Sequence, residues 1–231
     1  MSEDNWQEDW VPMHTESVAM PPPIAAILRG VQTARVSEIA AVLFTAGIRF
    51  IEVPLNSPDP FTSIAKLVAA HGSNCLIGAG TVLDVEAVRN TYAAGGRLIV
   101  APNCNPEVIR EGLQRGMTVL PGVATATEAF TAIRAGATHL KLFPAATYGP
   151  RHLQALRVVL PPDVRVWPVG GVGVADIPAW LAAGAGGFGF GSELFRPEYE
   201  LPDIEQRAQQ LVHAVRATLP GAMQGRATTT V

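Results

Sequence analysis

The feature that most constrains the fold is a unit that repeats along nearly the whole chain. A stretch with apolar residues at helical spacing ends at a glycine, a short apolar run follows, and a loop of Gly, Pro, Asn or Ser closes the unit. The apolar runs lack a polar face, which is typical of parallel strands covered by helices. We expect the glycine before each run to end its helix with a positive φ. The units are clearest in TAGIRFIEVPLNS, HGSNCLIGAGT, AAGGRLIVAPN, QRGMTVLPGVA, RAGATHLKLFPA and AAGAGGFGFGS.

Two more runs, IAAILRG and RVWPVGG, raise the number of predicted strands to eight. Eight strand–helix units in series predict an α/β fold, a (β/α)8 TIM barrel, as a single domain over residues 21–219. The polar segment 1–20 is predicted to be a mobile N-terminal tail, and 220–231 a C-terminal tail. An open doubly wound sheet is the alternative. It would show fewer strands and a phosphate-binding glycine fingerprint, which GAG at 78–80 does not complete.

Composition excludes several classes of function. The net charge is −3 and Lys and Arg form no run, so a nucleic-acid partner is not expected. No apolar run is long enough to cross a membrane, and the acidic start MSEDNWQEDW does not resemble a signal peptide, so we expect a cytoplasmic protein. Cys75, Cys104 and the five histidines show no metal-ligand spacing, and no cofactor motif is present. The sequence therefore predicts no metal and no cofactor.

Two ionisable residues interrupt strands that are otherwise apolar. Glu52 lies in FIEVPL and Lys141 in HLKLFP, and alternation along a strand points both side chains toward the barrel axis. A lysine with apolar surroundings favours the neutral amine that attacks carbonyl groups, and a half-buried carboxyl suits general acid–base catalysis. The structural alternatives are a buried ion pair for Lys141 and a partner for a cation such as Arg29 for Glu52. Together the two residues favour a Schiff-base mechanism.

Other candidate residues lie where predicted strands end. Arg29 ends the first strand and can bind a carboxylate or a phosphate, although a surface arginine is the plain alternative. Thr81 can donate a hydroxyl to a substrate or simply satisfy its own loop. Glycine-rich segments, PVGGVG and GFGFGS, follow the last two strands, where barrels commonly bind phosphate; tight turns are the alternative. The predicted phosphate contacts are Gly170, Gly171, Gly191 and Ser192.

These motifs resemble one family of enzymes, the 2-keto-3-deoxy-6-phosphogluconate/6-phosphogalactonate aldolases. The resemblance runs from about Pro22 to about Tyr199 and is carried by ILRG, IEVPLNSP, IGAGTV, IVAPN, PGVATATEA, LKLFPA, VGGV and GFGSELFR. It implies a class I, metal-independent aldolase with a (β/α)8 barrel and no cofactor. It also implies a homotrimer that splits a phosphorylated 2-keto-3-deoxy sugar acid into pyruvate and glyceraldehyde 3-phosphate.

The resemblance also assigns roles to individual residues. Lys141 in LKLFP matches the Schiff-base lysine and Glu52 in IEVPL the general acid–base. Arg29 and Thr81 match substrate-binding positions, and Gly171, Gly191 and Ser192 match the phosphate site.

Two positions resemble the phosphogalactonate branch of the family. Asn56 in EVPLN stands where the phosphogluconate branch typically has arginine, and Val169 stands before Gly-Gly where that branch tends to have threonine. A phosphogluconate aldolase remains an alternative. So do a phosphosugar isomerase or epimerase, which would use the same pair for proton transfer, and a phosphosugar-binding barrel without activity.

Overall fold

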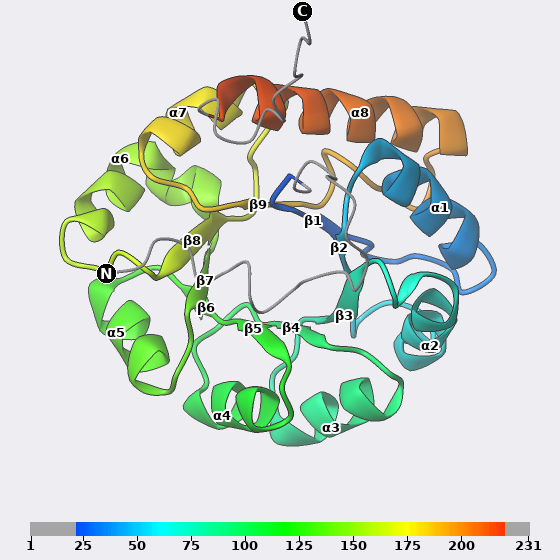
Figure 1. Ribbon diagram of the computed structural model, residues 1–231, viewed down its shortest axis with the longest axis horizontal. Helices are drawn as coiled ribbons and strands as arrows, with labels where there is room; N and C mark the ends of the chain where they lie inside the picture. The colour runs from blue at the N-terminus through cyan, green and yellow to red at the C-terminus, as the bar shows by residue number, and fades with distance from the viewer. Residues whose placement is uncertain (1–21, 220–231) are drawn as a thin grey trace, which may run out of the picture.

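The protein has an α/β fold in which parallel strands alternate with helices. The computed structural model describes residues 22–219, and the tails predicted at 1–20 and 220–231 lie outside this range. The helices surround the strands on their outer side only (Figure 1). A doubly wound sheet would have helices on both faces, so that alternative does not fit. The strands are β1 (Ile24–Ile27), β2 (Phe50–Pro54), β3 (Leu76–Gly80), β4 (Leu98–Val100), β5 (Thr118–Leu120), β6 (Gly122–Val123), β7 (His139–Leu142), β8 (Arg165–Pro168) and β9 (Phe188–Phe190).

Eight α-helices and one short 3-10 helix lie within the described residues. Arg35, Asp84, Asn105 and Thr125 immediately precede four of the helices, and the last three cap them with a side-chain oxygen. The helices are α1 (Val36–Ala46), α2 (Pro60–His71), α3 (Val85–Ala93), α4 (Pro106–Gln114), α5 (Ala126–Arg134), α6 (Ala145–Arg157), η1 (Val174–Asp176), α7 (Ile177–Ala182) and α8 (Leu201–Thr218).

The strands form two parallel sheets that curl around a common centre (Figure 1). One has the order β5-β4-β3-β2-β1-β9 and the other the order β6-β7-β8. Between β8 and β9, the Gly186 N–H donates to the Val166 carbonyl at 2.9 Å and a bridge joins Val169 to Gly189. The eighth of the predicted strands is thus β9, which pairs with β1.

One predicted strand is divided in two. The run MTVLPGVA was expected to form a single strand, but Pro121 separates β5 from β6. Proline has no backbone N–H to donate to a neighbouring strand, so it interrupts the pairing. Its carbonyl still accepts from the Lys141 N–H at 2.8 Å.

The expected glycine ends of the helices are only partly confirmed. Gly47 has φ 102° after α1, and its N–H donates to the carbonyls of Leu43 and Phe44, as a left-handed C-cap does. The prediction is wrong for Gly72 after α2, which has φ −61° and continues the helical backbone with a bond to the Val68 carbonyl. The polar stretch after Gly72 makes the turn there instead.

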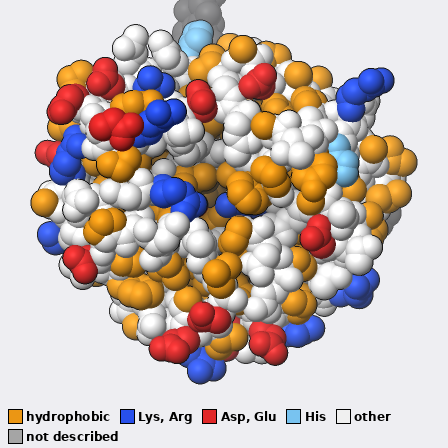
Figure 2. All heavy atoms as spheres, turned by 180° about the vertical axis from the view of Figure 1, so that it is seen from behind, with side chains coloured by type: hydrophobic (Ala, Val, Ile, Leu, Met, Phe, Trp, Pro, Cys, Tyr) orange, Lys and Arg blue, Asp and Glu red, His pale blue; other side chains and the backbone are white. Residues whose placement is uncertain are grey.

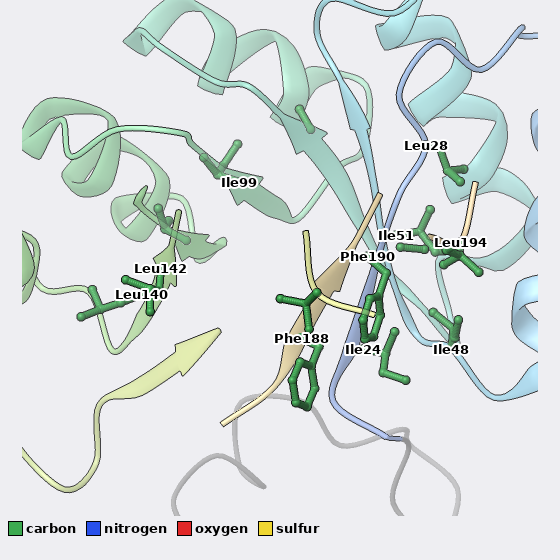
Figure 3. Packing of buried hydrophobic residues seen from close by; sticks show 14 of the residues in the cluster. Ile24, Leu28, Ile48, Ile51, Ile99, Leu140, Leu142, Phe188, Phe190 and Leu194 are labelled. Carbon is green, nitrogen blue, oxygen red and sulfur yellow. The ribbon is translucent and has the colours of Figure 1, made fainter. Parts of the chain in front are cut away.

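The two faces of a strand belong to different clusters of the apolar core. Ile99 of β4 belongs to a large cluster between strands and helices, whereas its neighbours Leu98 and Val100 belong to a second, smaller cluster. Figure 3 shows part of the large cluster, where the rings of Phe188 and Phe190 stack with centroids 5.6 Å apart. Strand side chains alternate between these faces, so the residues between members of the large cluster point inward. No helix within residues 22–219 has the length and apolar character needed to span a bilayer.

Candidate active site

Glu52 and Lys141 both lie on the inner face of the sheet. Their strand neighbours, Ile51 and Val53 in β2 and Leu140 in β7, belong to the large outer cluster, which leaves the inner face to the two ionisable residues. Glu52 is 1% exposed and Lys141 5% exposed. Lys66, the other lysine of the chain, is exposed on α2. Lys141 is therefore the only buried lysine available for chemistry.

Burial moves the pKa values of both groups toward neutrality. It raises the pKa of Glu52 to about 7, and the positive charges of Lys141 and Arg29 only partly oppose this rise. Burial also lowers the pKa of Lys141, an effect that Glu52 opposes and Arg29 reinforces. A lysine that loses its proton more readily than usual and a carboxyl that can gain or lose a proton near pH 7 therefore lie in one buried site.

Among residues 22–219, no hydrogen bond or ion pair joins the Glu52 carboxyl or the Lys141 amine to another side chain. The Oε2 atom of Glu52 is buried and, within residues 22–219, has no hydrogen-bond partner. None of the side-chain ion pairs in this part of the chain joins Glu52 to Lys141. The Nζ atom of Lys141 lies 4.9 Å from the centroid of the Phe143 ring. Both groups can therefore contact a bound molecule.

Three of the predicted substrate-binding residues meet where β1, β2 and β3 end. Arg29 donates from Nη1 to Oδ1 of Asn56 at 2.6 Å and from Nη2 to Oγ1 of Thr81 at 3.4 Å. Thr81 has φ 57°, a left-handed conformation that a β-branched residue rarely adopts. The buried Ser57 hydroxyl accepts from the Gly30 N–H at 2.9 Å and fixes the backbone next to Arg29. The guanidinium is held in place although it is exposed.

The predicted phosphate glycines lie in two adjacent loops. The bridge between Val169 and Gly189 aligns the ends of β8 and β9, so the loops that follow start side by side. Gly170 and Gly171 have φ values of 94° and 72°, which favour glycine. Gly191 starts the other loop. The remaining residue of the set, Ser192, follows it and is exposed.

Val169 itself is 5% exposed and directly follows β8. Its N–H donates to the Leu142 carbonyl at 3.0 Å, one residue beyond Lys141. The position thus borders the strand that carries the buried lysine. The opposite face of the molecule from that seen in Figure 1 is hollowed near its centre, and Lys or Arg atoms lie there among apolar side chains (Figure 2).

Sequence reasoning missed Gly80 as part of this site. The residue lies in β3 on the same inner face as Glu52, and a Cβ atom at this position would overlap the Glu52 carboxyl group. The signal for this role is GAG at 78–80, which places two glycines on one face of a buried strand. Across residues 22–219, His, Cys, Asp and Glu side chains do not gather in threes as metal ligands do.

Comparison with known proteins identifies the family to which the chain belongs. A sequence model described as "KDPG and KHG aldolase" matches residues 16–210. The chain is 45% identical to the 2-dehydro-3-deoxy-6-phosphogalactonate aldolase of Escherichia coli (strain K12), over 84% of this chain and 95% of that protein. A structure described as native KDPGal superposes with a TM-score of 0.84 at 43% identity, covering 89% of this chain and 98% of that one.

A third relative bears on the chemistry. The KDPG aldolase of Legionella pneumophila, whose structure holds pyruvate captured as a covalent carbinolamine intermediate, superposes with a TM-score of 0.73. It is 27% identical and covers 85% of this chain and 94% of its own. A carbinolamine is the adduct of an amine and a ketone, the precursor of a Schiff base. By family match and by identity over most of its length, the chain belongs to the KDPG and KHG aldolase family.

Proposed function

We propose that this chain is a class I aldolase that cleaves 2-dehydro-3-deoxy-6-phosphogalactonate to pyruvate and glyceraldehyde 3-phosphate, without a metal or a cofactor. One observation carries the proposal: a buried lysine with a lowered pKa shares the inner face of the sheet with a buried carboxyl whose pKa is about 7. We infer this substrate from the Escherichia coli relative, a 2-dehydro-3-deoxy-6-phosphogalactonate aldolase that is 45% identical to this chain.

In this mechanism, neutral Lys141 attacks the C2 ketone and loss of water gives an iminium. Glu52, directly or through a water molecule, takes the proton of the C4 hydroxyl as the C3–C4 bond breaks. The electrons of that bond move into the iminium and form an enamine, and the aldehyde leaves. Glu52 then returns a proton to C3, and hydrolysis releases pyruvate. A carboxyl with a pKa near 7 can both accept and donate the proton at neutral pH.

The remaining predicted residues bind the substrate in this proposal. Arg29 and Thr81 contact the carboxylate end, since Arg29 offers a planar fork that Asn56 and Thr81 orient. Val169 and Asn56 face the sugar chain on either side of Lys141. Backbone N–H groups and one hydroxyl bind the phosphate, and they belong to Gly170, Gly171, Gly191 and Ser192.

We further propose the architecture and assembly of the enzyme. The two curled sheets close into one (β/α)8 barrel, a single domain over 21–219, through the contacts between β8 and β9 and the continuity of β5 with β6. A homotrimer in the cytoplasm fits the family. One related structure, 44% identical, is a designed cage made by fusing symmetric oligomeric domains, which supports an oligomer.

Borohydride reduction in the presence of pyruvate tests the function. Hydride adds to C2 of the iminium and fixes pyruvate on the lysine as a stable secondary amine. Peptide mass analysis should find the adduct on Lys141. A protein that turns over the sugar acid without forming this adduct would contradict the Schiff base, and turnover to an isomer without release of pyruvate would indicate an isomerase.

A further inference from the structure

The Glu52 carboxyl group rests directly against the backbone of Gly80. A Cβ atom built on Gly80 would overlap all three outer atoms of the Glu52 side chain, Oε2, Cδ and Oε1. The carboxyl group therefore occupies the space that any other residue at position 80 would fill. The two residues lie on neighbouring strands, β2 and β3, whose register pairs Glu52 with Gly78 and Pro54 with Gly80.

The backbone itself does not require glycine at this position. Gly80 is not among the glycines with positive φ, and its carbonyl accepts from the Leu55 N–H at 2.8 Å as in ordinary strand pairing. Its role is therefore steric. Gly78, two residues earlier on the same face, differs because a Cβ atom there would overlap the Leu98 backbone, which cannot move aside.

Steric contact with Gly80, and not a hydrogen bond, limits the position of the Glu52 carboxyl group at its Oε2 atom. Oε2 is fully buried without a hydrogen-bond partner among the described residues, so no protein donor fixes this atom. Contact with Gly80 fixes the carboxyl position and leaves the oxygen available for a substrate proton. A methyl group at position 80 would instead push the end of a flexible side chain away.

We propose that Gly80 is a positioning residue: because it has no side chain, the Glu52 carboxyl can occupy the place from which it transfers a proton. The inference rests on the proposed function of Glu52. Because the carboxyl end of Glu52 can move, Gly80→Ala should leave the fold and Lys141 intact while proton transfer fails.

Two reactions of pyruvate separate these effects. Borohydride trapping needs Lys141 but not the base. Deuterium exchange at the pyruvate methyl group in D2O, followed by NMR, needs the Schiff base and the base together, since a methyl proton must leave and a deuteron return to C3. For Gly80→Ala we expect trapping within a few-fold of the unmodified enzyme and exchange at least about 30-fold slower, which is most of the smallest contribution, about 100-fold, that general acid–base catalysis typically makes.

The matched control is Ala79→Gly, the adjacent residue of β3 on the outer face. It should lower the midpoint of thermal unfolding, because a buried methyl group is lost, without changing the ratio of exchange to trapping. In a Glu52→Gln background, which already lacks the base, Gly80→Ala should cause no further loss of exchange.

Stability gives an independent measurement. Gly80→Ala should lower the thermal midpoint of the unmodified protein but raise that of Glu52→Ala, because the new methyl group fills the space that the carboxyl leaves. Exchange within twofold of the unmodified enzyme, equal losses of exchange and trapping, or a Gly80→Ala chain that does not fold would each overturn the inference. Absence of the adduct in the unmodified enzyme would instead overturn the proposed function.

Discussion

Replacing Glu52 by glutamine is expected to stabilise the protein above neutral pH while it removes activity. The carboxyl group is 1% exposed, and burial raises its pKa from an ordinary value of 4.5 to about 7. The folded protein therefore holds a proton that the unfolded chain releases at lower pH. Unfolding becomes easier as pH rises from about 4.5 to about 7, and the loss is complete above the folded pKa.

The magnitude follows from the shift. One pKa unit corresponds to about 1.4 kcal/mol, so a shift from 4.5 to about 7 costs the folded state about 3 kcal/mol at pH 8. At pH 5 most of this cost is absent, because the folded protein keeps Glu52 protonated and the unfolded chain is only partly ionised. A neutral glutamine of nearly the same shape carries no such dependence. The stability of Glu52→Gln relative to the unmodified protein should rise by roughly 2 to 3 kcal/mol between pH 5 and pH 8.

Urea unfolding at several pH values measures this difference. The slope with pH is the test, because any constant cost of burying the amide cancels between pH values. Lys141→Met serves as the second background. Loss of the lysine charge should raise the pKa of Glu52 further and extend the destabilised range to higher pH. A Glu52→Gln difference that stays flat from pH 5 to pH 8 would refute the reasoning and would mean that Glu52 ionises as an exposed carboxyl does.

Three other outcomes are expected. Lys141→Met should form no borohydride adduct and lose at least about 10³-fold in kcat/KM, measured by pyruvate release, because the covalent step has no substitute. Val169→Thr should narrow the preference for the galactonate over the gluconate epimer by less than about tenfold, since one neutral hydrogen bond contributes about 1 kcal/mol; unchanged kcat/KM values for both epimers would exclude a role for this position. Light scattering at micromolar concentration should give three times the chain mass of 24.4 kDa, and a monomer would contradict the trimer.

The inward position of both reactive residues could be predicted because it depends on strand periodicity alone. Apolar neighbours on both sides of Glu52 and of Lys141 fix the outer face of each strand, and one ionisable residue between them must then point inward. The same periodicity predicted parallel strands covered by helices. These features are local, so a single sequence carries them.

The features that were not predicted depend on contacts between distant segments or on one backbone choice. Pro121 divides a predicted strand because it has no backbone N–H to donate to a neighbouring strand, and Gly72 keeps a helical φ although the sequence around it resembles the other helix ends. The left-handed Thr81 and its contact with Arg29 join segments separated by 52 residues. No window of sequence that contains only one of these segments can specify the contact.

Gly80 could not be predicted because its role depends on a contact between two strands. It also shows that the site depends on more than its ionisable groups. Its glycine is visible in the sequence, but its purpose is set by the register between β2 and β3, which brings it against the carboxyl of a residue 28 positions earlier. In the proposed mechanism a lysine and a glutamate on inward strand positions supply the chemistry, whereas the neighbouring glycine leaves room for the carboxyl without binding its outer oxygen. Burial without a hydrogen bond is also what raises the pKa of Glu52 to about 7. The steric and the electrostatic properties of the carboxyl therefore have one origin, and a side chain at position 80 that displaced it toward water should change both together.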